Sequence, residues 1–180
     1  MATKTETGQL IGVGIVAAFA TLSFVGTVVI RIPIPVTGGY FNLGDTFVMA
    51  AALLYGPWTG ALVGLIGPAA ADALGYPQFI LATALIKFCE GGLVGLMAGK
   101  PGRDTRVRPA AGLALGVAVL VGGYFVFEAF IYPALGKVIP FFAVTDMKAA
   151  LAEIFPNLLQ GVLSAVIAFG IGRVFRRQNQ

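Results

Sequence analysis

Long runs of apolar residues, separated by short polar or glycine- and proline-containing segments, dominate the chain. A helix needs about 20 mostly apolar residues to cross the roughly 30 Å hydrocarbon layer of a bilayer, and several runs reach that length. A lipid-facing barrel would show segments of about ten residues in which polar and apolar positions alternate, and the sequence does not show that pattern. The pattern therefore predicts an all-α integral membrane protein with six transmembrane helices, at about residues 10–30, 44–55, 57–75, 79–98, 110–132 and 150–172.

The second and third of these helices come from one continuous apolar run between Asp45 and Leu74. That run is too long for one comfortable crossing and too short for two full ones. It contains the pair Gly56-Pro57, and proline lacks a backbone donor and disfavours helix in the residue before it. We therefore expect a short second helix that ends at this pair and a full third helix after it.

Composition supports a membrane protein, because 58% of the 180 residues are hydrophobic and 11% are charged, whereas soluble domains carry roughly 25% charged residues. The first run includes Ala18-Phe19-Ala20, which is similar to a signal-peptide cleavage site. However, the run continues past Ala20 to Arg31, as a membrane helix would. The length leaves no room for a second domain, so residues 1–180 are expected to form one transmembrane domain.

The net charge of +4 comes largely from basic residues in two places, and these favour cytoplasmic segments rather than nucleic-acid binding. With Lys4 on the same side, an even number of helices must separate the N-terminus from the first basic segment. Both termini are then inside, and the outer segments are residues 31–44, 75–78 and 133–149. The basic segments contain Lys100, Arg103, Arg106 and Arg108, and Arg173, Arg176 and Arg177.

Ionisable side chains are costly inside a bilayer and usually face a cavity or a partner. A rise of about 1.5 Å per residue, applied to this topology, places every such residue of the predicted helices in the outer half of the membrane. A pocket that opens to the outside would require that placement. The residues are Asp45, Asp72, Lys87, Glu90, Glu128 and Glu153, with Asn42, Asn157 and Gln160 as neutral companions.

Lys87 and Glu90 lie three positions apart on one predicted helix, close enough to form an ion pair. The pair either contributes to the pocket or is a purely structural ion pair. Aromatic residues flank the same level of the membrane, and some of them belong to the interfacial belt. Flat rings beside donors and acceptors suit a small heteroaromatic ligand, and the carboxylates favour one with donors or a positive charge, although Lys87 weakens that argument. The aromatic residues are Tyr40, Phe41, Tyr76, Phe79, Tyr124, Phe125, Phe127 and Tyr132.

The stretch NLGDTFVMAAALLYGPWTGALVGLIGPAAADALGY, followed by IKFCEGGLVGLMAG, resembles the substrate-binding S component of energy-coupling factor (ECF) transporters. The nearest branch is the riboflavin type, which is also similar to the hydroxymethylpyrimidine and pyridoxine carriers. The resemblance extends from about residue 11 to residue 99, and the last two helices match in length and placement. It rests on the order G-D, G-P-x-x-G-x-x-x-G, D and I-K-x-x-E-G.

The resemblance implies a multi-pass protein of a prokaryotic cell membrane that captures a vitamin or vitamin precursor on its outer side. It also implies delivery through an ATP-driven complex with a membrane coupling (T) subunit and two cytoplasmic ATPase subunits. The chain has no G-x-x-x-x-G-K-[ST] motif, so ATP hydrolysis is expected from those other subunits and the chain itself is not expected to be an enzyme. No cofactor is expected, and the absence of histidine argues against a metal site.

Small residues recur at four-residue spacing in three helices, which allows close helix approach in lipid. In the third and fourth helices, Gly56, Gly60 and Gly64, and Gly91, Gly95 and Gly99, favour packing within the chain. In the first helix, family resemblance implies a contact with the coupling subunit. The best matches for that contact are Gly14 with Ala18, or Ala17 with Thr21.

The outer segment after the first helix closes over the ligand in the family that the chain resembles. In the sequence YFNLGD, Tyr40 could then cover a ring, while Asn42 and Asp45 hydrogen-bond its edge. Asp45 could instead cap the second helix, with Gly44 in the turn. The complete set of expected substrate-binding residues is Tyr40, Asn42, Asp45, Asp72, Lys87, Glu90, Tyr124, Glu128 and Asn157.

Other functions remain open from the sequence. An autonomous proton-coupled transporter of a small heteroaromatic could use Asp72, Glu90 or Glu128 as its proton carrier. A membrane enzyme would have to rely on Asp and Glu for all acid-base chemistry, since there is no histidine. A purely structural scaffold would not explain the one-sided polar set.

Overall fold

The structure is a computed structural model that describes residues 4–35, 37–99 and 107–178. Lys100, Arg103 and Arg106 of the predicted inner loop therefore lie outside the described residues. The side chains of Lys4, Arg176 and Arg177 are also outside the description, although their backbone is helical.

The described residues are almost entirely helical, and the boundaries follow the apolar runs. Six helical segments form in these ranges, because α5 continues without a break through a π-helical stretch, η2, into α6. Short 3-10 turns, η1 (Pro77–Phe79) and η3 (Pro140–Phe142), precede α4 and α7. The helices are α1 (Lys4–Val29), α2 (Asp45–Tyr55), α3 (Pro57–Asp72), α4 (Ile80–Ala98), α5 (Val107–Val126) with η2 (Phe127–Ile131) and α6 (Tyr132–Gly136), and α7 (Met147–Gln178).

The break between α2 and α3 lies where the sequence predicts it. Gly56 adopts φ 92°, a conformation that glycine reaches without steric cost, and Pro57 is the first residue of α3. By length and composition, four helices could cross a membrane: residues 7–29, 77–98, 107–136 and 147–175. Since α2 and α3 are shorter than a full crossing, the six-crossing topology stays a prediction.

The segment after α1, expected as a loop, is instead an antiparallel hairpin of β1 (Ile32–Ile34) and β2 (Gly39–Phe41). The first strand contains two β-branched isoleucines and the second contains two aromatic residues, both favoured in strands, and Ile32 pairs with Phe41. The turn is closed by Gly38, whose φ is 71°. Each strand has only three residues, which is too short for a strand pattern to be recognised in the sequence.

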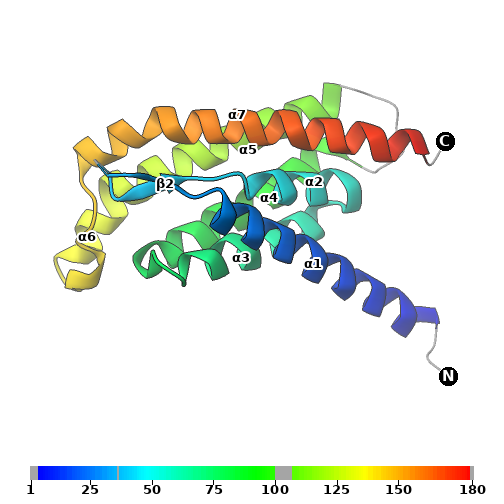
Figure 1. Ribbon diagram of the computed structural model, residues 1–180, viewed down its shortest axis with the longest axis horizontal. Coiled ribbons are helices and arrows are strands. Elements are labelled where there is room, and N and C mark those ends of the chain that lie inside the picture. Colours follow the sequence, from blue (N-terminus) through cyan, green and yellow to red (C-terminus); the bar gives the residue numbers. More distant parts are fainter. Residues whose placement is uncertain (1–3, 36, 100–106, 179–180) are drawn as a thin grey trace.

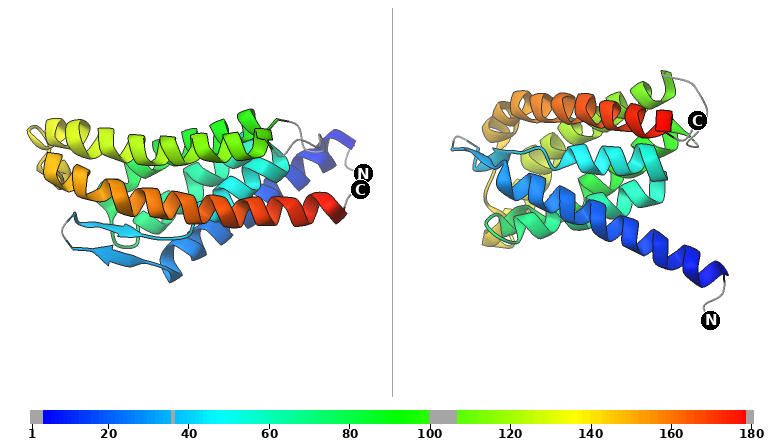
Figure 2. Two further views of the ribbon diagram at one scale, coloured as in Figure 1. Left: turned by 90° about the horizontal axis from the view of Figure 1, so that it is seen from above. Right: turned by 45° about the vertical axis from the view of Figure 1, so that its right-hand side comes forward.

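Both termini lie at one end of the molecule, and the hairpin, the α3–α4 connection and α6 lie at the opposite end (Figures 1 and 2). An even number of crossings requires the termini to be on one side. The arrangement also gathers the three predicted outer segments at a single end, which we call the hairpin end.

Helices α3 and α4 approach so closely that glycine is required at their contact. A Cβ atom on Gly60 would lie 2.5 Å from the Cβ of Ala52 and 2.7 Å from the carbonyl oxygen of Gly91. One on Gly95 would lie 2.5 Å from the Cα of Pro57. The predicted packing of small residues within the chain is therefore confirmed for these glycines, whereas Gly56 and Gly99 have positive φ and end helices α2 and α4.

Candidate functional site

A buried ion cluster joins α2 and α4 near the hairpin end. The Nζ atom of Lys87 lies 2.7 Å from Oδ1 of Asp45 and 2.9 Å from Oε2 of Glu90. All three side chains are at most 2% exposed. The predicted Lys87–Glu90 pair is confirmed, and Asp45 joins it from α2. One ammonium group is therefore shared by two carboxyl groups.

Gln160 connects this cluster to α7 and to the hairpin. Its Nε2 donates to Oδ2 of Asp45 over 2.7 Å, and its Oε1 accepts from the backbone N–H of Asn42 over 2.8 Å. The side-chain amide of Asn42 donates to the same oxygen over 3.2 Å, and its own Oδ1 accepts from the N–H of Gly44. One continuous hydrogen-bonded chain therefore runs from α4 through α2 and α7 to the end of β2.

Asp45 does not cap α2, so that alternative interpretation of the sequence is wrong. It is the first helical residue, Gly44 occupies the capping position, and no side chain caps the helix. The carboxylate of Asp45 has instead two other partners, Lys87 and Gln160, and both of these interactions are buried. Its position in the first turn is also favourable for a negative charge near a helix N-terminus.

The hairpin is fixed to the end of α3 by a second set of polar and aromatic contacts. The phenol of Tyr40 donates to Oδ1 of Asp72, and burial together with that carboxylate raises the pKa of Tyr40 above its usual value, so it remains a donor. The guanidinium of Arg31 lies 4.7 Å from the ring centre of Tyr40 and 5.2 Å from that of Tyr76, and donates to the carbonyl of Ala71 over 2.8 Å. These contacts hold the hairpin down across the α3–α4 connection.

A small cavity of about 30 Å³ lies between β2, α4, α5, η2 and α7, beneath the hairpin. Most of its lining side chains can hydrogen-bond, and Phe79 and Gly39 complete the wall. The hydroxyls of Thr83 and Tyr124 are 2.9 Å apart, so this side is already ordered. The lining residues are Gly39, Tyr40, Asn42, Phe79, Thr83, Tyr124, Glu128, Glu153, Asn157 and Gln160.

Two carboxylates line this cavity. Glu128 belongs to the π-helical stretch η2, and Glu153 belongs to the second turn of α7. Single π-helical turns inside α-helices are frequent at functional sites. Glu153 accepts a hydrogen bond from the hydroxyl of Thr37 in the hairpin turn, whereas Oε2 of Glu128 is buried without a hydrogen-bond partner among the described residues.

The structure divides the expected substrate-binding residues into two groups. Tyr40, Asn42, Tyr124, Glu128 and Asn157 line the cavity. The other four, Asp45, Asp72, Lys87 and Glu90, lie in the two polar contact sets beside it and do not line it.

Some lining residues were not in that expected set. Phe79, Glu153 and Gln160 stand out in the sequence as polar or aromatic residues near the outer surface, and only the structure places them on the cavity wall. Thr83 gives no sequence signal, because threonine is ordinary in membrane helices. Among the described residues, no group of three or more acidic, Cys or His side chains is arranged to hold a metal ion.

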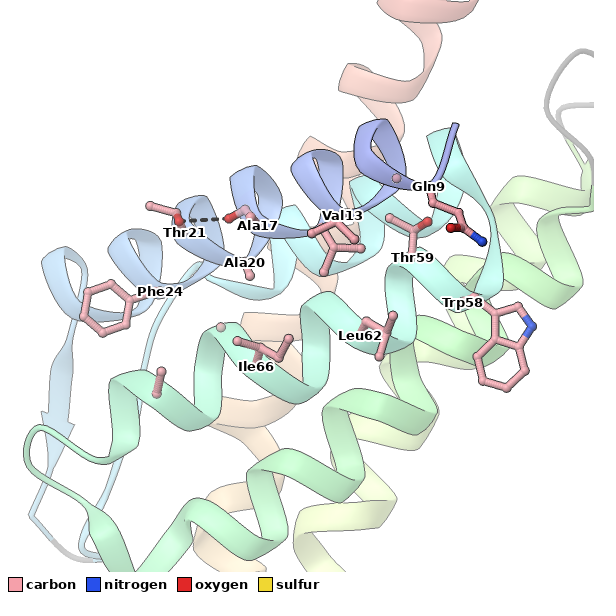
Figure 3. A pocket seen from close by; sticks show the side chains of 14 residues that line it. Gln9, Val13, Ala17, Ala20, Thr21, Phe24, Trp58, Thr59, Leu62 and Ile66 are labelled. Atoms are coloured by element: carbon pink, nitrogen blue, oxygen red, sulfur yellow. Dashed lines mark hydrogen bonds between the residues drawn. The ribbon is translucent and has the colours of Figure 1, made fainter. Parts of the chain in front are cut away.

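A larger apolar groove of about 930 Å³ runs between α1 and α3 on the side of the helix bundle (Figure 3). Ala17 and Thr21 line it, and the Thr21 hydroxyl is satisfied by the carbonyl of Ala17 at 2.9 Å. Gly14 and Ala18 are exposed but do not line the groove. Of the two predicted contact pairs on α1, the groove therefore includes Ala17 with Thr21.

The comparisons with known proteins agree with this architecture. The sequence model of a family described as "ECF-type riboflavin transporter, S component" matches residues 4–177. An "Uncharacterized protein in gap 3'region" of Pyrococcus woesei is 34% identical over 154 residues, which cover 86% of this chain and 94% of that protein. A solved structure described as "Structure and mechanism of the S component of a bacterial ECF transporter" aligns with a TM-score of 0.65 and 16% identity, covering 96% of this chain and 99% of that one.

Proposed function

This chain belongs to the family of ECF-type riboflavin transporter S components, and from that premise we propose that it captures a vitamin or vitamin precursor at its hairpin end. S components are substrate-binding membrane subunits of vitamin uptake transporters and not enzymes. The chain is accordingly a multi-pass membrane protein with a transport function. Which compound it binds, and how it delivers that compound, are the subjects of the proposal.

The observation that carries the proposal is the cavity beneath the hairpin. Donors and acceptors from β2, α4, α5, η2 and α7 converge on it, and the rings of Tyr40, Phe79 and Tyr124 supply flat faces. Pockets for small molecules are usually mostly apolar with a few convergent polar groups. This one is richer in polar groups, which suits a heteroaromatic ring with hydrogen-bonding substituents. Riboflavin, or a single ring of the hydroxymethylpyrimidine or pyridoxine type, has that chemistry.

Binding of any such ring requires the hairpin to move. A cavity of about 30 Å³ is far smaller than the roughly 300–1,000 Å³ of ordinary ligand pockets. The hairpin covers the cavity through Gly39 and Tyr40, and it is fixed by side chains rather than by a long sheet. We therefore assign it the role of a lid, with Arg31, Tyr40 and Asp72 as the latch.

In the proposed cycle, the loaded protein delivers its ligand through a complex with a T subunit and two cytoplasmic ATPase subunits in a prokaryotic cell membrane. The α1–α3 groove is our candidate for the contact with the T subunit, since it presents small residues over a wide apolar surface. The basic segments near the α4–α5 connection and the C-terminus would then face the cytoplasm, with the hairpin end outside.

Uptake in cells tests the proposal. A host without its own riboflavin uptake is given this chain alone, or this chain with T and ATPase subunits, and the internalised compound is measured for riboflavin, hydroxymethylpyrimidine and pyridoxine. The proposal expects uptake of one of these only when the complete set is present, and loss of uptake when the ATPase sites are inactivated. Uptake by the chain alone that collapses with an uncoupler would instead establish the proton-coupled alternative.

A further inference from the structure

The buried charges of the described residues are strongly unbalanced. Five carboxylates are buried, and the one buried cation is Lys87. That lysine is already bound by Asp45 and Glu90. Asp72 accepts a hydrogen bond from the phenol of Tyr40, and the half-buried Arg31 binds the carbonyl of the neighbouring Ala71. The remaining two, Glu128 and Glu153, make no salt bridge within the described part of the chain.

Those two unpaired carboxylates are the ones that line the cavity. Glu128 is 4% exposed and Glu153 is 3% exposed, and both line the same small cavity. Burying a charge without a partner is costly, so a folded protein normally neutralises it. Oε2 of Glu128 has no hydrogen-bond partner among the described residues. The cavity therefore contains an acceptor that its own walls leave unsatisfied.

The rest of the wall adds to the preference for positive charge. No lysine or arginine is among the lining residues, which include the ring of Phe79. The rings of Tyr40 and Tyr124 already lie 4.7 Å from the guanidinium of Arg31 and 5.5 Å from Nζ of Lys87, so Phe79 is the lining ring that remains for a ligand. The faces of aromatic rings attract cations, most strongly where water is excluded. Asn157 and Gln160 contribute amide groups that can accept hydrogen bonds, although Gln160 already uses its oxygen for Asn42.

We propose that the ligand of this site carries a cationic, hydrogen-bond-donating group, an ammonium or a protonated aminoheterocycle, which binds between Glu128 and Glu153. This inference rests on the proposed function and narrows it, because riboflavin is uncharged at neutral pH. Charge-assisted hydrogen bonds to two carboxylates would supply the neutralisation that the protein lacks. The hairpin would then close over the bound cation, with Thr37 bonded to Glu153.

A matched pair of probes isolates the charge. We would titrate the purified full-length protein in mild detergent with 4-amino-5-aminomethyl-2-methylpyrimidine, an ammonium at neutral pH, and with its neutral 5-hydroxymethyl counterpart. Riboflavin is the third probe, and isothermal titration calorimetry is the readout. We expect the ammonium probe to bind roughly tenfold or more tightly than the hydroxymethyl probe, as a hydrogen bond to a charged group provides.

Acid-to-amide variants test whether Glu128 and Glu153 cause the preference for the ammonium probe. Glu128→Gln and Glu153→Gln should each remove most of the advantage of the ammonium probe. Asp146→Asn is the control, because Asp146 is exposed at the start of α7 and does not line the cavity. If Glu128→Gln does not fold, Glu153→Gln supplies the test alone.

The inference is overturned if the ammonium probe fails to bind the wild-type protein, if either neutral probe binds as tightly, or if both Gln variants keep the preference. None of these results depends on the ATPase subunits. Tight, glutamate-independent binding of riboflavin would refute the inference and leave the proposed function intact. ATP-independent uptake would refute the proposed function whatever the charge of the ligand.

Discussion

Gln160 donates to Asp45 over 2.7 Å although 115 positions separate the two residues in the sequence. The same amide accepts the backbone N–H of Asn42, so one side chain of α7 fixes both the start of α2 and the end of the hairpin. Among the described residues, Gln160 is the side chain whose hydrogen bonds join α7, α2 and the hairpin. The bond therefore couples the lid to the ion cluster beneath it.

Removal of that amide should loosen both attachments. Gln160→Ala leaves a carboxylate oxygen and a backbone donor without their partners, at a cost of about 1–3 kcal/mol each. For a chain of this size the two losses together should lower the thermal midpoint in detergent by roughly 4–24 °C. Gln9→Ala is the control, since Gln9 is exposed on α1. An unchanged midpoint for Gln160→Ala would show that the bond is not needed for stability.

The ion cluster should depend on Lys87 more than on either acid. Lys87→Met leaves Asp45 and Glu90 buried side by side, and removal of one partner of a buried pair typically costs about 3–5 kcal/mol. The double variant Lys87→Met with Glu90→Gln removes a charge of each sign and should recover much of the stability. Thermal unfolding should rank the wild type as most stable, the double variant next and Lys87→Met last. A double variant no more stable than Lys87→Met would contradict it.

Substitution of alanine for glycine should separate helix contacts from helix propensity. Gly60→Ala places a methyl group against Ala52 and the carbonyl of Gly91, and overpacking of that kind costs about 1–3 kcal/mol or more. Gly14→Ala meets nothing within 4 Å and should be neutral or stabilising by up to about 1 kcal/mol. Yield of folded monomer and thermal midpoint measure both. Equal effects at the two positions would refute the close packing of α3 on α4.

The latch of the hairpin should require a guanidinium and not merely a positive charge. Arg31→Lys keeps the charge but loses the planar group that lies over Tyr40 and Tyr76. A lost cation–π contribution of about 0.5–2 kcal/mol should raise hydrogen exchange of the hairpin amides roughly 2- to 30-fold. Arg173→Lys is the matched control, because its guanidinium also lies over a ring, 5.9 Å from that of Phe169, but near the C-terminal end of α7 and away from the hairpin. Equal protection of the hairpin in all three proteins would remove the latch from the proposal.

A bulky residue in the α1–α3 groove should impair delivery without impairing capture. Ala17→Phe fills the groove, whereas Ala18→Phe adds the same ring on an exposed position outside it. We expect ligand binding to the purified protein to be unchanged in both variants. Uptake with the T and ATPase subunits should fall sharply for Ala17→Phe alone. A larger loss for Ala18→Phe would assign the contact to Gly14 and Ala18 instead.

Local features of the fold are predictable from the sequence. The Gly56-Pro57 break follows from backbone chemistry, and the Lys87–Glu90 pair follows from spacing along one helix. Both depend on neighbours in the sequence, so no tertiary structure is needed to predict them. The family resemblance, carried by the first four helices, led to the right fold and family.

The site itself is less accessible to such reasoning. Which polar residues line the cavity and which support it depends on the rotation of α4 and α7, and the sequence does not give that rotation. Lys87 is expected from the sequence to line the pocket, but in the structure it pairs with Asp45 and Glu90 and lies behind the ring of Tyr124, 5.5 Å from its centre. The π-helical turn that carries Glu128 likewise has no sequence signal, because it depends on one extra residue in a continuous helix.

Glycine at the contact between α3 and α4 also limits how the protein can open. Where two backbones touch with no side chains between them, there are no rotamers to rearrange and no space for one helix to slide past the other. These two helices must therefore move as a single rigid body. The cavity can therefore widen to admit a ring only between the hairpin and α7. These two are held together by side-chain hydrogen bonds of Thr37, Asn42 and Gln160, which can break and re-form.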